Sequence, residues 1–100
     1  MELPAHVKIK EKSWLARLAA IKLASNKMAM VVGKTIYLHN ITQEAFLEDD
    51  AWVRHELQHV LQYQQHGTFL FLIKYMIEWI KHGYYNNAFE IEAREAERIN

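Results

Sequence analysis

Hydrophobic and polar positions along the chain predict one short pair of strands near the middle. Residues 28–32 and 35–39 are rich in hydrophobic and β-branched side chains, and Gly33-Lys34 separates them. This pattern is typical of a tight β-hairpin. Residues 1–12 are predicted to be an extended polar arm that can add a strand to the small sheet.

The remaining hydrophobic positions recur at helical spacing and predict a mostly helical chain. A short helix or turn is expected over 42–47, and Gly67 is a typical stop for the helix before it. The longer helices are expected over about 14–26 after Ser13, about 51–66, 69–81, and about 88–99 after Asn87. We therefore expect an α+β fold, mostly helical, with a small sheet.

The segment 69–81 is apolar nearly all round, although it contains Lys74 and Glu78. Such a helix is usually buried in the core, and core packing is the interpretation we favour. The alternative is a helix that also meets a partner or a membrane surface. The segment is too short to cross a bilayer.

Composition limits the classes of function. One hundred residues suit a single domain over 1–100, and the formal net charge is +0. With no basic stripe, a nucleic-acid partner is not expected. The chain has no cysteine, so His, Asp and Glu are the available metal ligands. No secretory signal or integral membrane span is predicted, and we expect a cytoplasmic protein.

His55-Glu56-Leu57-Gln58-His59 carries the clearest chemistry in the chain. Histidines at i and i+4 lie on one helix face, where both imidazoles can bind the same Zn²⁺. Glu56 can accept a proton from a water activated by that metal. The pattern predicts a zinc-dependent hydrolase, with His55 and His59 as ligands and Glu56 as general base.

A catalytic zinc needs a third protein ligand, and the glutamate-rich helix over 88–99 can supply it. Glu90 and Glu92 are the two candidates. Glu92 lies nearer the centre of the expected apolar face of this helix, where a buried carboxylate needs a partner. Glu95 and Glu97 are expected to be solvated.

His55–His59 followed by Glu90-Ile91-Glu92-Ala93-Arg94 resembles the gluzincin metallopeptidases, specifically the small minigluzincins. The resemblance covers the chain from residue 28 onward. It implies a minimal zincin-like domain with one zinc per chain, held by His55, His59 and Glu90. In that clan an Asp often stands where this chain has Arg94, so the residue that supports a ligand histidine stays unassigned.

The resemblance also implies hydrolysis of a peptide or protein substrate, bound as an added strand along the hairpin. Candidates for stabilising the oxyanion are Tyr63, His66, Tyr84 and Tyr85. His6 and His39 are expected at the surface. Minigluzincins suggest latency: residues 1–12, the end of the last helix or self-association with a second molecule could block the cleft.

Two hypotheses from other classes remain open. In one, the chain binds zinc without turnover and serves as a peptide-binding or assembly module. In the other, the histidine pattern is a coincidence and a metal-free helical protein docks partners through the apolar segment 69–80.

Overall fold

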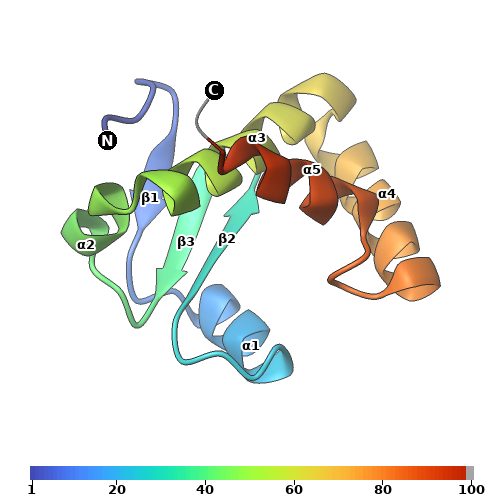
Figure 1. The fold of residues 1–100 in the computed structure, drawn as a ribbon, viewed down its shortest axis with the longest axis horizontal. Helices are drawn as coiled ribbons and strands as arrows, with labels where there is room; N and C mark the ends of the chain where they lie inside the picture. Colours follow the sequence, from blue (N-terminus) through green and yellow to red (C-terminus); the bar gives the residue numbers. More distant parts are fainter. Residues whose placement is uncertain (99–100) are drawn as a thin grey trace.

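A three-stranded mixed sheet lies at the centre of the chain, for which the computed structural model describes residues 1–98 (Figure 1). Its strand order is β1 (Lys8–Lys10), β3 (Thr35–His39), β2 (Met28–Val32). β3 pairs antiparallel with β2 and parallel with β1. The predicted hairpin and the strand from the N-terminal arm are therefore confirmed. The positive φ of Gly33, 66°, matches a two-residue turn.

Five helices surround the sheet in the described residues: α1 (Trp14–Lys22), α2 (Gln43–Glu48), α3 (Asp50–His66), α4 (Thr68–His82) and α5 (Ala88–Ala96). Side chains expected as N-caps accept hydrogen bonds from the first turns, as Ser13 does from the N–H of Ala16 and Asn87 from that of Phe89. Gly67 ends α3 with a φ of 83°, which favours glycine. The α+β class is confirmed.

α1 and α3 cover opposite faces of the sheet (Figure 1). Ala29 and Val31 of β2 and their neighbours on β3 pack in one cluster with Val53 and Val60 of α3. The buried alanines of α1 lie outside that cluster, on the other face. α5 packs mainly along α3, and α4 contacts both of these helices. α3, which contains His55–His59, therefore lies between the sheet and the two C-terminal helices.

The end of α1 differs from the prediction. The helix stops at Lys22 rather than near Asn26, because Ala24 adopts a left-handed backbone with a φ of 54°. The burial of α1 is also unexpected: Trp14, Leu18 and Ile21 are exposed, and the small residues face the sheet. The expected end of the last helix near Ile99 lies outside the described residues.

The prediction that the segment 69–81 packs in the core is wrong for most of α4. Phe71 is the buried residue of this helix, and it packs against Tyr63 and Phe89. Phe69, Ile80 and most other apolar side chains of α4 are exposed. One face of the helix is enough to close the core of this small chain, so the other face stays uncovered. None of the helices described is long and apolar enough to cross a membrane.

Candidate metal centre

α3 brings the three motif residues to one place in the middle of a regular helix. Ring centroids of His55 and His59 are 5.1 Å apart, as expected for side chains one turn apart on one face. Glu56 and His59 are buried, and His55 is half-buried. The helix has 17 residues, so these side chains lie away from its fraying ends.

Glu90 of α5 meets both histidines. Its Oε1 atom lies 3.1 Å from Nε2 of His55 and 3.1 Å from Nε2 of His59. One ligand atom from each residue lies within 4.8 Å of the others, so the three side chains are close enough to hold a metal ion. Among residues 1–98, neither His6 nor His39 joins this group.

Glu92 points away from the group. It is exposed, and its carboxylate accepts hydrogen bonds from the side-chain amides of Gln58 at 3.0 Å and Gln62 at 2.8 Å. The helix-face argument that favoured Glu92 is therefore wrong: α5 buries Glu90 and Ala93 against α3. The polar position at the centre of the packed face is Glu90.

The second ring nitrogen of each histidine, Nδ1, also has a hydrogen-bond partner. Nδ1 of His55 donates to a carboxylate oxygen of Glu97 over 2.7 Å, and Nδ1 of His59 donates to Oε1 of Gln62 over 2.8 Å. Gln62 is fixed in turn by the carbonyl of Phe89 and by Glu92. Such contacts fix the ring orientation of a ligand histidine and direct Nε2 towards the metal.

Gln62 was not predicted at the site, and Glu97 was expected to be solvated. Both positions follow helical spacing. Gln62 is three residues after His59, and Glu97 is seven residues, or about two turns, after Glu90. Glu97, rather than residue 94, holds the ring of His55. Arg94 instead lies over the ring of Tyr85.

Tyr75 of α4 is the functional candidate that the sequence analysis did not identify. Its hydroxyl donates to Oε2 of Glu90. Because a buried tyrosine hydroxyl normally needs a partner, a lone tyrosine in an apolar helix was the available signal. Of the residues considered earlier, Tyr84 and Tyr63 both line a cavity beside this group, but the hydroxyl of Tyr63 donates to the carbonyl of Val31.

The other two candidates lie away from the histidine pair. Tyr85 is exposed, and His66 stacks on Phe71 with its Nδ1 3.1 Å from Nζ of Lys74. Neither lines the cavity that contains the three candidate ligands.

Proton affinities in the group are strongly coupled. Burial opposes charge on His55, but hydrogen bonding to Glu90 and the nearby carboxylates of Glu56 and Glu97 raise its pKa to about 9. Burial raises the pKa of Glu56 to about 7, against the pull of the two histidines. Burial would also raise the pKa of Glu90, but hydrogen bonds from His55, His59 and Tyr75 hold it well below its ordinary value. In the metal-free group, protons on the histidines balance the charge of Glu90.

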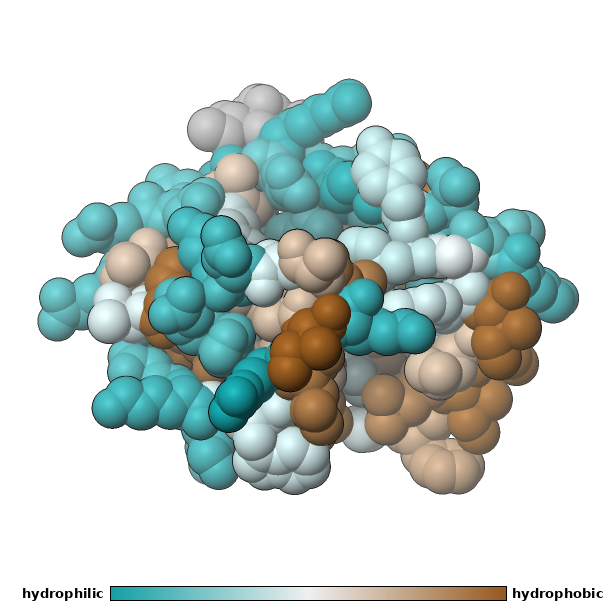
Figure 2. Space-filling view, turned by 90° about the horizontal axis from the view of Figure 1, so that it is seen from below, coloured by the Kyte–Doolittle hydropathy of each residue, from teal (hydrophilic) through white to brown (hydrophobic). Residues whose placement is uncertain are grey.

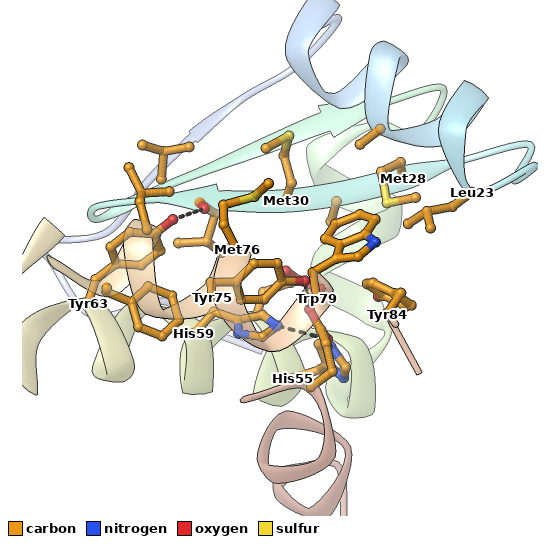
Figure 3. Close-up of a pocket in the computed structure, with 18 residues that line it drawn as sticks. Leu23, Met28, Met30, His55, His59, Tyr63, Tyr75, Met76, Trp79 and Tyr84 are labelled. Carbon is orange, nitrogen blue, oxygen red and sulfur yellow. Dashed lines mark hydrogen bonds and ion pairs between the residues drawn. The ribbon is translucent and has the colours of Figure 1, made fainter. Parts of the chain in front are cut away.

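An apolar cavity of about 210 Å³ opens beside this group (Figure 3). β2 forms one wall, with Met28 and Met30 in view, while His55 and His59 rise from α3 on the opposite side. Aromatic side chains of α4, among them Trp79, close a third side. β2 is an edge strand, so its unpaired edge borders the cavity.

No residue of the N-terminal arm, 1–12, lines this cavity. β1 pairs with β3 at the far side of the sheet from β2. In this conformation the arm belongs to the sheet rather than to the cleft.

The sequence model of the eCIS core domain family matches residues 5–67, more than half of the chain. The matched segment reaches from the N-terminal arm to the end of α3 and contains His55, Glu56 and His59. It ends before α5, which provides Glu90. Searches among curated proteins and among solved structures find no match to this chain.

Proposed function

We propose that this chain, which belongs to the eCIS core domain family, binds one zinc ion and hydrolyses peptide bonds in the manner of a minimal gluzincin. The observation that carries the proposal is the meeting of His55, His59 and Glu90 beside a buried glutamate, on a cavity bordered by an open strand. The family description names no peptidase, so the gluzincin assignment rests on these residues.

The donor set fits zinc. Two imidazole nitrogens and one carboxylate oxygen match the three-ligand sites of catalytic zinc, which keep a further position for water or substrate. The set has no thiolate, and its two nitrogen donors disfavour magnesium or calcium, which prefer oxygen ligands. Glu97 and Gln62 support the rings from behind, as expected for metal-bound histidines.

A bound zinc supplies a Lewis acid that acidifies water and polarises a carbonyl group. Glu56 follows His55 on α3, and its buried carboxylate lines the same cavity. In the proposed reaction this carboxylate accepts a proton from the attacking water and passes it to the amine nitrogen of the leaving peptide. Tyr75 and Tyr84 offer hydroxyl donors that can stabilise the developing negative charge on the carbonyl oxygen.

The free edge of β2 offers main-chain groups for an extended peptide. The carbonyl of Val31 points away from β3, since it accepts the hydroxyl of Tyr63. Backbone direction alternates along a strand, so the N–H and C=O of Ala29 point to the same open edge. A peptide paired there would lie across the cavity next to the histidines. The apolar lining from β2 and α4 favours hydrophobic substrate side chains.

Glu56→Gln tests the catalytic part of the proposal. This substitution keeps the size of the side chain and removes its basicity, so hydrolysis of a quenched fluorescent peptide library should fall by about 100-fold or more. Zinc content should stay at the wild-type level, because Glu56 is not among the three proposed ligands. Glu44→Gln, on an exposed position of α2, is the matched control and should leave the rate unchanged.

Two outcomes would contradict the proposal. Wild-type activity in Glu56→Gln would assign the hydrolysis to a contaminant. Zinc-loaded wild-type protein that cleaves no peptide in the library would favour the alternative of a zinc-binding module without turnover.

A further inference from the structure

α1 exposes its large hydrophobic side chains and buries its small ones. Trp14 is 69% exposed and Ile21 67%, with Leu18 between them on the same stripe, whereas Ala16 and Ala20 are buried against the sheet. A helix that only completes a core shows the opposite arrangement. This outward stripe is therefore a candidate for contact with something outside the described chain.

α4 carries a second outward stripe. Phe71, Tyr75 and Trp79 face the protein interior and the cavity. At roughly 100° per residue, the exposed apolar side chains cover an arc of about 160° on the outer side. They are Phe69, Leu70, Leu72, Ile73, Met76, Ile77 and Ile80. Phe69 and Ile80 are 77% and 80% exposed, so nothing in residues 1–98 covers this arc.

Both stripes are visible on one face of the molecule. Figure 2 shows hydrophobic side chains gathered near the centre and towards the right, where α1 and α4 lie when the chain is seen from below. α1 and α4 also border the same cavity, through Leu23 and Met76 among others. We call the two stripes together the α1–α4 surface. Exposed apolar side chains that gather on one face, rather than singly, mark a candidate interaction site.

The charged side chains that α1 and α4 place beside the α1–α4 surface are mostly positive. Arg17 and Lys22 flank the stripe of α1, and Lys81 flanks the arc of α4. Within residues 1–98, no ion pair joins these three cations to a carboxylate. α1 contains no acidic residue, and Glu78, the one in α4, accepts the backbone N–H of Ala88.

We propose that the α1–α4 surface docks on an anionic lipid bilayer. Protruding Trp, Phe, Leu and Ile side chains with cations at their border are the signature of helices that lie in a membrane interface. Cations contribute because anionic headgroups attract them. The apolar side chains enter the boundary between headgroups and acyl chains, and Arg17, Lys22 and Lys81 contact the headgroups.

A second copy of this chain fits the surface less well. An isologous contact would bring the cations of both copies to one rim, and Glu78, the one acidic residue of the two helices, already accepts the backbone N–H of Ala88. A folded partner must match the shapes of two separate helical ridges, whereas a bilayer accepts both ridges without such a match. The charge and the shape therefore favour lipid.

Vesicle flotation tests this proposal on metal-free and zinc-loaded protein alike, so its outcome is independent of hydrolysis. The probes are vesicles of pure phosphatidylcholine and of an equimolar mixture with phosphatidylglycerol. The wild-type chain should float with the anionic vesicles and stay behind with the neutral ones. Raised salt should weaken the binding, because it screens the attraction between the cations and the headgroups.

Paired variants separate the two contributions. Ile21→Ser with Ile80→Ser removes apolar contact from both ridges, and we expect partitioning to fall by roughly tenfold or more. Arg17→Gln with Lys81→Gln should reduce binding by about tenfold on anionic vesicles. The control for the apolar pair is Leu61→Ser, which changes a side chain 42% exposed on α3. Lys8→Gln with Lys34→Gln, at exposed positions of β1 and of the hairpin turn, controls for the charge pair.

Each of the following results would overturn the proposal. The wild-type chain fails to float with anionic vesicles, or it floats equally well with neutral ones. The apolar pair binds like the wild type although its thermal unfolding shows a native fold. Light scattering detects a dimer that Ile21→Ser with Ile80→Ser dissociates, which would assign the surface to a second copy. An acidic amphipathic peptide binds while both kinds of vesicle do not, which would assign it to a protein partner.

Discussion

Replacing Glu97 by Ala should weaken zinc binding although Glu97 is not one of the proposed ligands. Its carboxylate accepts a hydrogen bond of 2.7 Å from Nδ1 of His55 and thereby holds the ring with Nε2 facing Glu90. Alanine removes that support and leaves the imidazole free to rotate. The backbone at this position stays fixed, because Arg54 donates two hydrogen bonds to the carbonyl of residue 97.

The size of the effect follows from the contact. A hydrogen bond that involves a charged group contributes roughly 1.5–3 kcal/mol. The side chain of Glu97 is 40% exposed, so solvent screening places this one at the lower end. We expect about 1.4–2 kcal/mol, or a zinc dissociation constant raised by about 10- to 30-fold. This agrees with the losses usual for residues that orient metal-bound histidines.

Competition with a chromophoric zinc chelator at neutral pH measures the effect directly. Glu95→Ala is the matched control, since Glu95 is an exposed glutamate on the same helix and should leave the affinity within about twofold of the wild type. The reasoning is refuted if Glu97→Ala binds zinc as tightly as the wild type. Equal losses in both variants would also refute it, because net charge rather than orientation would then explain them.

Three further predictions concern the cavity, the metal-free group and the core. Tyr75→Phe should retain zinc but lower kcat by about tenfold or more with little change in KM, as steady-state kinetics would report, and an unchanged kcat would remove Tyr75 from the reaction. In metal-free protein, the raised pKa of His55 gives stability that is complete below its ordinary value of 6.5 and is lost as pH rises through about 9. The melting temperature of the metal-free protein should therefore fall over this interval. A rise would contradict the interpretation that protons on the histidines balance the charge of Glu90. Phe71→Ala should destabilise the fold by about 3–5 kcal/mol in urea unfolding, because Phe71 is buried between Tyr63 and Phe89; a loss under about 1 kcal/mol would show that α4 is not docked there.

Local signals in the sequence predicted much of the fold. The turn at Gly33-Lys34, the caps at Ser13 and Asn87 and the stop at Gly67 each have a specific backbone role, and each is found where expected. The α3 helix was also predicted nearly to its ends. These features depend on neighbouring residues and need no knowledge of tertiary contacts.

The sequence did not predict which face of each helix is buried. Helical periodicity tells which side chains share a face, but it does not tell which face another element covers. α4 was expected in the core because it is apolar nearly all round, yet a chain of this size has too few elements to cover it. In α1 the choice of Ala16 and Ala20 as the inner face reverses the usual preference.

The two histidines of the candidate site could be predicted from the sequence, whereas most of their surroundings could not. His55 and His59 follow from spacing alone, because both lie on one helix. Glu97 and Tyr75 reach the site from outside α3, so their contacts depend on how α4 and α5 dock on that helix. Gln62 lies on α3 itself, three residues after His59, and its amide is oriented by Phe89 and Glu92 of α5. The decision between two glutamates on α5 likewise depended on which of them faces α3.

The most direct test of the proposed metal centre is the zinc content of freshly purified protein, measured by elemental analysis for the wild type, Glu90→Ala and Glu92→Ala. About one zinc per chain is predicted for the wild type and Glu92→Ala, and much less for Glu90→Ala. A wild-type chain that contains no zinc, and takes up none after dialysis against it, would contradict the account. Loss of zinc in Glu92→Ala together with its retention in Glu90→Ala would do the same.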